Sequence, residues 1–254
     1  MTSAPHTGNI QKGGALIEDS RRLIQTWDLE VAIADNFERI LDGNLLGKAT
    51  RRRSEDLLRR SLGPRLVSPG VHVLAALKDL LSDSVAFAAA LYYETSRDET
   101  LLAAFAEGPL FDWYQAGRSA VTIDDTTAWI AELTASGSMP PTTAIVRTKV
   151  ARGLLAALRD FGILQGATHK RFTHPHISLR GFAYVAFRLH EQGASSTALV
   201  TSSVWRRWIL DRDRVDDLLF QAARSGLLDY GVVGSAVRVD WHVTTIEEAV
   251  RAAA

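Results

Sequence analysis

Residues 142–172 read TTAIVRTKVARGLLAALRDFGILQGATHKRF. Apolar residues recur every three or four positions as far as Phe161, which predicts an amphipathic helix capped by Thr142-Thr143. Gly162 then ends the helix, and Ile163-Leu164 begins an extended segment. A polar loop with lysine, arginine and histidine follows. A long helix followed by a short basic hairpin is typical of the second half of a winged helix-turn-helix.

The residues on either side of this stretch supply the other parts of that motif. Asp124 or Asp125 is expected to cap a preceding helix, and the turn at 137–141, GSMPP, leads from it into the long helix. The hairpin loop occupies 166–175, and a further helix is expected at 179–191. The order is therefore helix, turn, helix, strand and basic hairpin.

The C-terminal part repeats this pattern in part. A helix at 215–226 ends at a glycine and leads to two short β-like segments within 231–240. Its end, AARSGLL at 222–228, resembles ALRDFGIL at 157–164. Both patterns indicate a helix that stops at glycine and continues into a hydrophobic strand, although ordinary helix-stop chemistry produces the same likeness.

The first region of the chain has the pattern of a helical bundle with short connections. The pair Gly63-Pro64 is expected to end a basic helix there. Helices are expected at 15–27, 29–41, 50–62, 71–81, 84–94 and 98–107. We therefore predict a mainly α protein with a disordered lead-in at 1–13, an N-terminal helical domain at 14–117 and a winged-helix-like C-terminal domain with small β hairpins at 118–254.

The composition narrows the class of protein. The 254 residues include no cysteine, which excludes disulfides, thiolate zinc sites and cysteine nucleophiles and fits a reducing compartment. The longest apolar run, Val85 to Tyr93, is less than half of the roughly 20 residues that a membrane helix needs. The first fourteen residues lack the apolar core of a signal peptide. We therefore expect a cytoplasmic protein that does not contact a membrane.

A net charge of zero conceals two basic zones. Residues 44–65 contain seven lysines and arginines against two acids, and residues 140–188 contain eight against Asp160 alone. Together these windows contain 15 of the 29 basic residues and 3 of the 29 acids. Clustered cations of this kind favour a polyanionic partner such as nucleic acid.

One face of the long helix is predicted to approach phosphates. Thr148, Lys149, Arg152 and Arg159 gather opposite its apolar face, and the basic hairpin follows. The arginine-rich helix near residue 55 is a second surface, because phosphate binding gains energy from counterion release without base contacts. For both surfaces a solvated helix face is the alternative interpretation. The predicted DNA-binding residues are Arg51, Arg52, Arg53, Arg59, Arg60, Arg147, Lys149, Arg152, Arg159, Lys170, Arg171 and Arg180.

Motifs of catalysis and of metal binding are missing. No lysine has an acid two positions before it, and neither Gly-x-Ser-x-Gly nor His-Glu-x-x-His occurs. His169, His174 and His176 have no nearby carboxylate, and Lys170 and Arg171 would repel a cation. We therefore expect a protein without catalytic residues, metal or cofactor.

Several stretches resemble the BrxA family of BREX bacteriophage-exclusion systems. These are GGALIEDSR at 13–21, the triplet Asn44-Leu45-Leu46 with the arginine-rich helix after it, and the segment from Thr143 to Leu164. The likeness spans roughly residues 10 to 250, and it is one of pattern, since no single motif is diagnostic.

The resemblance implies a small, non-enzymatic part of a phage-defence system that acts beside other BREX proteins. It also implies a fold similar to that of the helical RNA-binding protein NusB, and DNA as a ligand. The expected function is therefore double-stranded DNA binding, mainly through phosphates. The alternatives are a scaffold that docks onto other BREX proteins, and RNA binding of the NusB type. The sequence pattern does not indicate an oligomeric state.

Overall fold

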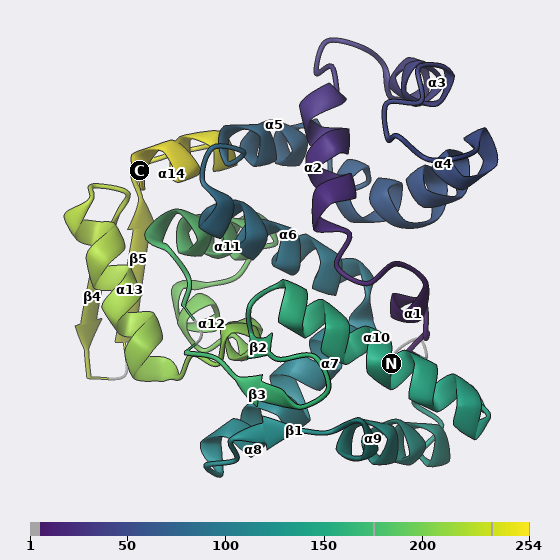
Figure 1. The fold of residues 1–254 in the computed structure, drawn as a ribbon. Helices are drawn as coiled ribbons and strands as arrows, with labels where there is room; N and C mark the ends of the chain where they lie inside the picture. Colours follow the sequence, from purple (N-terminus) through teal and green to yellow (C-terminus); the bar gives the residue numbers. More distant parts are fainter. Residues whose placement is uncertain (1–5, 175, 235, 254) are drawn as a thin grey trace. The chain divides into compact units, whose positions relative to one another are not determined.

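The computed structural model describes residues 6–174, 176–234 and 236–253. Over these residues the chain is mainly helical, and its strands form only small antiparallel pairings (Figure 1). The predicted mainly α fold with small hairpins is thereby confirmed. Residues 1–5 of the predicted lead-in and Pro175 of the predicted hairpin loop lie outside the described residues.

The chain forms two compact units, each assembled from segments that are distant in sequence. Unit 1 comprises Met1–Ala15, Thr95–His176 and Ser203–Leu210, and unit 2 comprises Leu16–Glu94, Ile177–Ser202 and Asp211–Ala254. Both units cross the predicted boundary after residue 117. The domains at 14–117 and 118–254 stay a prediction.

Unit 1 is built around two helices and a small sheet. The sheet has the strand order β1-β3-β2 with antiparallel pairing, and its register pairs Val121 with Lys170 and Leu164 with Phe172. Its elements are α1 (Ile10–Gly13), α7 (Thr100–Phe105), η2 (Ala106–Leu110), α8 (Phe111–Gln115), β1 (Ala120–Val121), α9 (Ile123–Ala135), α10 (Ala144–Asp160), β2 (Leu164–Gln165), β3 (Lys170–Phe172) and η3 (Ser203–Trp208).

Aromatic side chains join these elements into one core. The Phe105 ring lies 4.9 Å from the Trp129 ring of α9 and 5.8 Å from the Trp113 ring of α8, measured between centroids. Tyr114 packs edge-on against Phe172 of β3 at 5.2 Å. The aromatic contacts therefore hold the sheet and α9 in place around α8.

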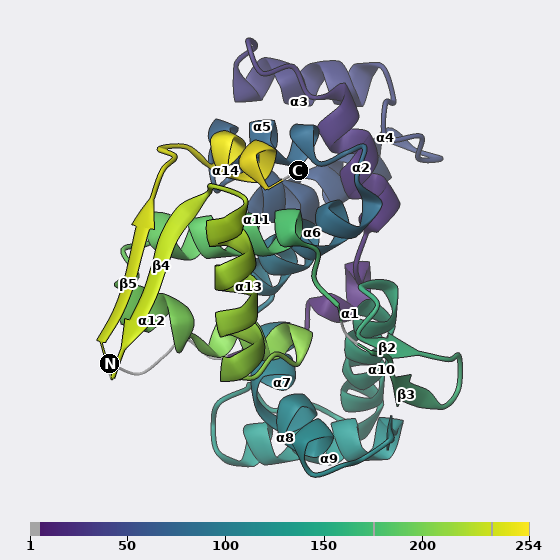
Figure 2. The same ribbon diagram turned by 90° about the vertical axis from the view of Figure 1, so that its left-hand side faces the viewer.

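Unit 2 contains the other helices and a two-stranded hairpin, in which β4 pairs with β5 from Leu228↔Trp241 to Val233↔Ala236. Figure 2 shows α13 beside this hairpin. The elements of unit 2 are α2 (Ile17–Thr26), α3 (Ile33–Asp42), α4 (Arg51–Leu57), η1 (Leu58–Val67), α5 (Val71–Asp79), most of α6 (Ser84–Asp98), α11 (Leu179–Glu191), α12 (Ser196–Val200), α13 (Arg212–Arg224), β4 (Leu228–Val233), β5 (Ala236–Trp241) and α14 (Ile246–Ala252).

A buried ion pair links α6 and α11 within unit 2. Arg188 Nε lies 2.9 Å from Glu94 Oε1, and the Tyr184 hydroxyl donates to the same oxygen at 2.9 Å. Burial and the carboxylate both raise the pKa of Tyr184, so the phenol stays protonated and acts as a donor. Each charge of the pair offsets part of the free-energy cost of burying the other, which would be high for either charge alone.

The pair Gly63-Pro64 does not end the basic helix, contrary to the prediction. Helix α4 continues into the π-helix η1, which includes both residues. Hydrogen bonds there span five residues, as in Ser68 N–H donating to the Gly63 carbonyl at 2.9 Å. Pro64, which has no N–H to donate, therefore lies in a segment that lacks the regular α-helical hydrogen-bond pattern. A Cβ atom at residue 63 would lie 2.8 Å from the Leu58 carbonyl oxygen, which makes glycine the residue that fits.

Two local predictions near the start of unit 1 were also wrong. Helix α9 is capped by Thr122, and Asp125 is the third helical residue of a capping box rather than the cap. The lead-in is not disordered throughout, because Ile10–Gly13 forms α1 and the Ile10 side chain is fully buried against unit 1. Its single apolar side chain gave too weak a periodic signal to predict a helix.

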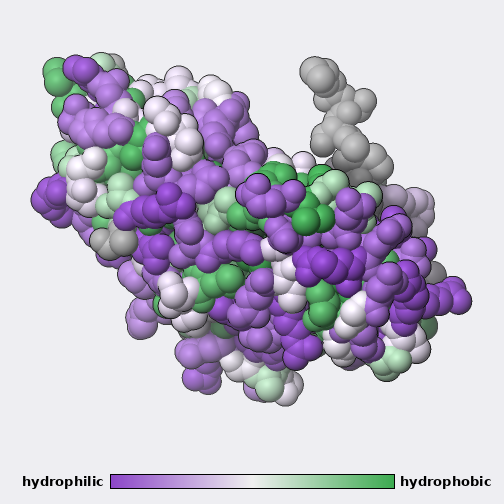
Figure 3. All heavy atoms as spheres, turned by 90° about the horizontal axis from the view of Figure 1, so that it is seen from above, coloured by the Kyte–Doolittle hydropathy of each residue, from purple (hydrophilic) through white to green (hydrophobic). Residues whose placement is uncertain are grey.

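The surface shows no broad apolar area on the face drawn in Figure 3, where hydrophobic atoms form small patches among hydrophilic ones. Among the described residues, none of the helices combines the length and apolar character that crossing a bilayer requires.

Candidate nucleic-acid interface

One side of α10 carries a line of exposed or half-buried side chains, which we call the α10 stripe: Ile145, Lys149, Arg152, Ala156 and Arg159. Their spacing of four, three, four and three residues keeps them on one face of a helix. Lys149 and Arg152 are exposed, and neither makes a hydrogen bond or ion pair with a described residue. The stripe therefore presents two uncompensated cations to solvent.

The other faces of α10 are covered within unit 1. Val150, Leu154 and Leu158 are fully buried, and α10 packs against α9 and α1. A Cβ atom at Gly153 would lie 2.9 Å from the Gln11 Cα, so glycine permits the close approach of α1. The packing fixes the rotation of the helix and leaves the α10 stripe as its open side.

The β2–β3 hairpin lies beside α10 (Figures 1 and 2) and supplies a third free cation. Arg171 is exposed and makes no side-chain bond with a described residue. Lys170 differs, because it is buried and its Nζ donates to the carbonyls of Gly166 and Ala167 at 2.5 and 2.7 Å. Burial and, next, Arg159 lower the pKa of Lys170. Lys170 thus closes the hairpin turn, whereas Arg171 faces solvent.

Two other predicted residues of α10 are partly engaged. Arg147 Nη1 donates to the Thr142 carbonyl at 2.6 Å across the first turn, and Arg159 pairs with the adjacent Asp160 at 2.6 Å. The Arg159 pair is exposed, so it is worth little and opens readily.

The predicted arginine-rich surface belongs to unit 2 and is largely paired. Arg51 pairs with Asp42, Arg59 with Glu55 at 2.9 Å and Arg60 with Asp56 at 3.4 Å. Only two of the five arginines predicted there lack a described partner, namely Arg52 and Arg53. The acids of α3 and α4 thus reduce the positive potential of this surface.

Arg180 also lies in unit 2, where it joins three segments. Its Nε donates to the Val250 carbonyl at 3.0 Å, its Nη2 donates to the Asp79 carbonyl at 3.2 Å, and Asp83 lies 3.6 Å away. The structure therefore brings together Arg147, Lys149, Arg152, Arg159, Lys170 and Arg171 in unit 1, and it places Arg180 with the arginine-rich helix in unit 2.

The partial repeat noted in the sequence is a repeated local structure. At both helix ends a glycine with φ of 80° follows the last turn, Gly162 after α10 and Gly226 after α13. In each case the next residue donates its N–H five residues back, from Ile163 to Leu158 at 2.9 Å and from Leu227 to Ala222 at 3.1 Å. Both helices therefore end in the same glycine turn, and each leads into an antiparallel hairpin.

The return strands of the two hairpins are anchored in the same manner. Thr173 N–H donates to the Ile163 carbonyl at 3.2 Å and its hydroxyl to the Gly162 carbonyl at 2.7 Å. In the second hairpin, His242 N–H donates to the Leu227 carbonyl at 3.0 Å and its Nδ1 lies 3.0 Å from the Gly226 carbonyl. The element of α10 with the β2–β3 hairpin and the element of α13 with the β4–β5 hairpin thus have the same backbone hydrogen bonds at the helix end, and different side chains.

The two helix–hairpin elements differ in charge. Helix α10 carries four basic residues and one acid, whereas α13 carries three of each. On α13, Arg212 pairs with Asp216 at 3.1 Å. Of the two helix–hairpin elements, the one in unit 1 is therefore suited to a polyanion.

His242 is expected to have a raised pKa, because its two ring nitrogens both face acceptors. Nε2 lies 3.3 Å from an Asp229 carboxylate oxygen, and Nδ1 faces the Gly226 carbonyl. The hydrogen bond with Asp229 and then that with Gly226 raise the pKa above 6.5. The stabilisation contributed by the protonated imidazole is therefore fully present below pH 6.5 and is lost as the pH rises through the folded-state pKa.

Histidine titration by NMR measures this shift. In Asp229→Asn the pKa of His242 is expected to fall toward 6.5. An unchanged His242 pKa in the variant would contradict the assignment of Asp229 as the main cause.

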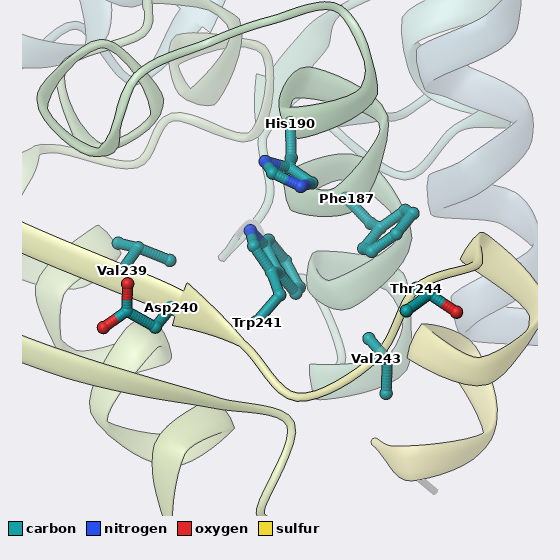
Figure 4. Close-up of a pocket in the computed structure, with 7 residues that line it drawn as sticks. All are labelled: Phe187, His190, Val239, Asp240, Trp241, Val243 and Thr244. Atoms are coloured by element: carbon teal, nitrogen blue, oxygen red, sulfur yellow. The ribbon is translucent and has the colours of Figure 1, made fainter.

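An open cavity of about 490 Å³ in unit 2 lacks the character of a phosphate site (Figure 4). The Trp241 ring packs edge-on against Phe187 at 5.0 Å, and Asp240 already pairs with Arg238. No lysine or arginine lines the cavity, whose lining residues are Phe187, His190, Val239, Asp240, Trp241, Val243 and Thr244. Within the described part of the chain, His, Asp and Glu side chains form no group of three that could hold a metal ion.

Besides Ala156, Ile145 is the member of the α10 stripe that was not predicted from the sequence. Its side chain is 71% exposed. A signal was available, since position 145 precedes Lys149 by four residues and Arg152 by seven, and so shares their face.

Comparisons with known proteins agree with this fold. A crystal structure of an uncharacterized protein from Magnetospirillum magneticum is similar with a TM-score of 0.61 and 18% identity, over 81% of this chain and 98% of that one. At this identity the likeness concerns the fold alone. No curated protein matches the chain. The sequence profile of the BrxA family matches residues 4–188, which is more than half of the chain. The chain therefore belongs to the BrxA family, whose members are components of BREX phage-defence systems.

Proposed function

We propose that this chain binds double-stranded DNA through unit 1, with the α10 stripe in the major groove and the β2–β3 hairpin beside it. The observation that carries the proposal is the set of free cations on this element. Lys149, Arg152 and Arg171 are exposed without partners among the described residues, whereas the arginines of the other predicted surface are mostly paired.

The topology of unit 1 supports this use of α10. The order β1, α9, α10, β2, β3 with the sheet arranged β1-β3-β2 matches the order expected for a winged helix-turn-helix and so supports the proposal. In helix-turn-helix proteins the second helix lies in the major groove and its N-terminal residues face the bases. Here the second helix is α10, and its N-terminal half carries Ile145, Lys149 and Arg152.

The electrostatics favour phosphate contacts as the main source of affinity. A cation that neutralises a phosphate releases condensed counterions, and the gain is larger when no carboxylate must first be displaced. Free lysines and arginines in unit 1 meet this condition, and the engaged side chain of Lys170 instead keeps the hairpin turn closed. Catalytic residues play no part in this proposal.

The test is fluorescence anisotropy with a labelled duplex of about 30 base pairs and the matching RNA duplex at about 50 and 200 mM salt. With three to four phosphate contacts, the DNA affinity is expected to fall about 40- to 150-fold across this range. Equal binding of RNA, or a preference for single-stranded RNA, would favour the RNA-binding alternative. Absence of binding to either duplex at the lower salt concentration would overturn the proposal and favour docking onto other BREX proteins.

A further inference from the structure

We infer that α10 reads base sequence as well as phosphates, and that Ile145 recognises the 5-methyl group of thymine in the major groove. This inference rests on the proposed binding of duplex DNA. It goes beyond phosphate contacts, because it assigns a specificity-determining role to an apolar side chain that no phosphate would attract.

The exposure of Ile145 is the observation that points to such a role. The large apolar side chains exposed elsewhere on described helices, Ile33, Val71, Val85 and Phe220, are exposed to between 44 and 49%, against 71% for Ile145. An isoleucine side chain that stays mostly in contact with water does not contribute the favourable free energy that its burial would give. Ile145 also lies at the second residue of α10, at the helix end that meets base edges in this architecture.

The chemistry of the stripe matches the pattern of base edges in the major groove. Thymine presents a methyl group there, and guanine presents two acceptors that lysine and arginine contact. Ile145 supplies an apolar contact, whereas Lys149 and Arg152 each carry several N–H donors and so contact guanine as well as the neighbouring phosphates. Their free side chains are available for this purpose, since no described residue pairs with either.

The spacing of the stripe fits neighbouring base pairs. Seven residues separate Ile145 from Arg152, and a helix rises about 1.5 Å per residue, so the two lie about 10 Å apart along the axis. Stacked base pairs repeat about every 3.4 Å, and the part of the stripe from Ile145 to Arg152 therefore spans about three of them. The expected binding site is a short motif that contains thymine and guanine.

The first step of the test selects ligands for the full chain from duplexes of about 30 base pairs with a randomised centre. We expect enrichment of a motif with thymine and guanine within about three base pairs. Each thymine of the enriched duplex is then replaced singly by uracil, which removes only the methyl group.

At one position the uracil duplex is expected to bind about fourfold more weakly, the effect of one buried methyl group of about 0.8 kcal/mol. In Ile145→Ala this difference between thymine and uracil should disappear while the salt dependence stays the same, because Ile145 contacts no phosphate. Ile33→Ala removes an exposed isoleucine from α3 and should keep the difference.

The outcomes separate this inference from the proposed function. Binding without an enriched motif, or equal affinity for every thymine and uracil duplex, would overturn base reading by Ile145 and leave phosphate binding intact. Retention of the difference in Ile145→Ala would also overturn it. Loss of binding to all duplexes, in contrast, would contradict the proposed function itself.

Discussion

Replacing Lys149 and Arg152 together by alanine is expected to lower the affinity for a DNA duplex of about 30 base pairs about 60-fold at about 0.1 M salt. Each phosphate contact contributes about 0.9 to the slope of the logarithm of affinity against the logarithm of salt, so the slope should decrease by about 1.8. Both side chains are exposed and unpaired among the described residues, so the substitutions remove charge without disturbing the core. Anisotropy over a series of salt concentrations measures both quantities.

The matched control removes the same charge from the other predicted surface. In Arg59→Ala/Arg60→Ala two exposed arginines are lost from η1, where each already pairs with an acid four residues away. We expect the salt slope of this variant to change by less than half as much. If the control variant loses the slope and the α10 variant keeps it, the binding surface is the arginine-rich helix and the assignment to α10 is wrong.

Local chemistry explains why the sequence predicted the central helix–hairpin element well. The Thr143 hydroxyl caps α10 as expected, and the positive φ of Gly162 ends it one residue after Phe161. The likeness between 157–164 and 222–228 is a shared hydrogen-bonded turn, since Gly162 and Gly226 adopt the same φ. These features depend on residues fewer than six positions apart, which a sequence window contains.

Whether a lysine or arginine is exposed and unpaired depends on residues that are distant in sequence, which a short stretch of sequence does not contain. Arg188 added to the basic character of residues 140–188, yet it is buried against Glu94, 94 positions earlier. Arg180 likewise donates to carbonyls 70 and 101 positions away. Lys170 is buried and donates to local carbonyls, and its strand pairs with β1 at Val121, 49 positions earlier. Composition therefore predicted a basic zone and could not indicate which of its charges are free.

The buried pair of Glu94 and Arg188 is expected to give the largest stability effect in unit 2. Arg188→Met removes the cation that lies 2.9 Å from the fully buried Glu94 carboxylate. Such a change costs about 3–5 kcal/mol of the free energy of unfolding, because the buried carboxylate loses an ion-pair partner that offsets the cost of burying it. Urea unfolding followed by circular dichroism measures the loss.

A second variant separates the charge from the packing. In Glu94→Gln/Arg188→Met the carboxylate is gone as well, and the amide oxygen introduced at position 94 can still accept from Tyr184, so more than half of the lost stability should return. Arg224→Met, an exposed arginine of α13 without a described partner, should change stability by less than about 0.5 kcal/mol. If the double variant is no more stable than Arg188→Met, packing around Arg188 causes the loss. Recovery would instead show that the pair links α6 and α11 because the two opposite charges offset each other. The basic segment 140–188 can therefore supply a buried arginine to the core of unit 2 and exposed, unpaired cations to unit 1.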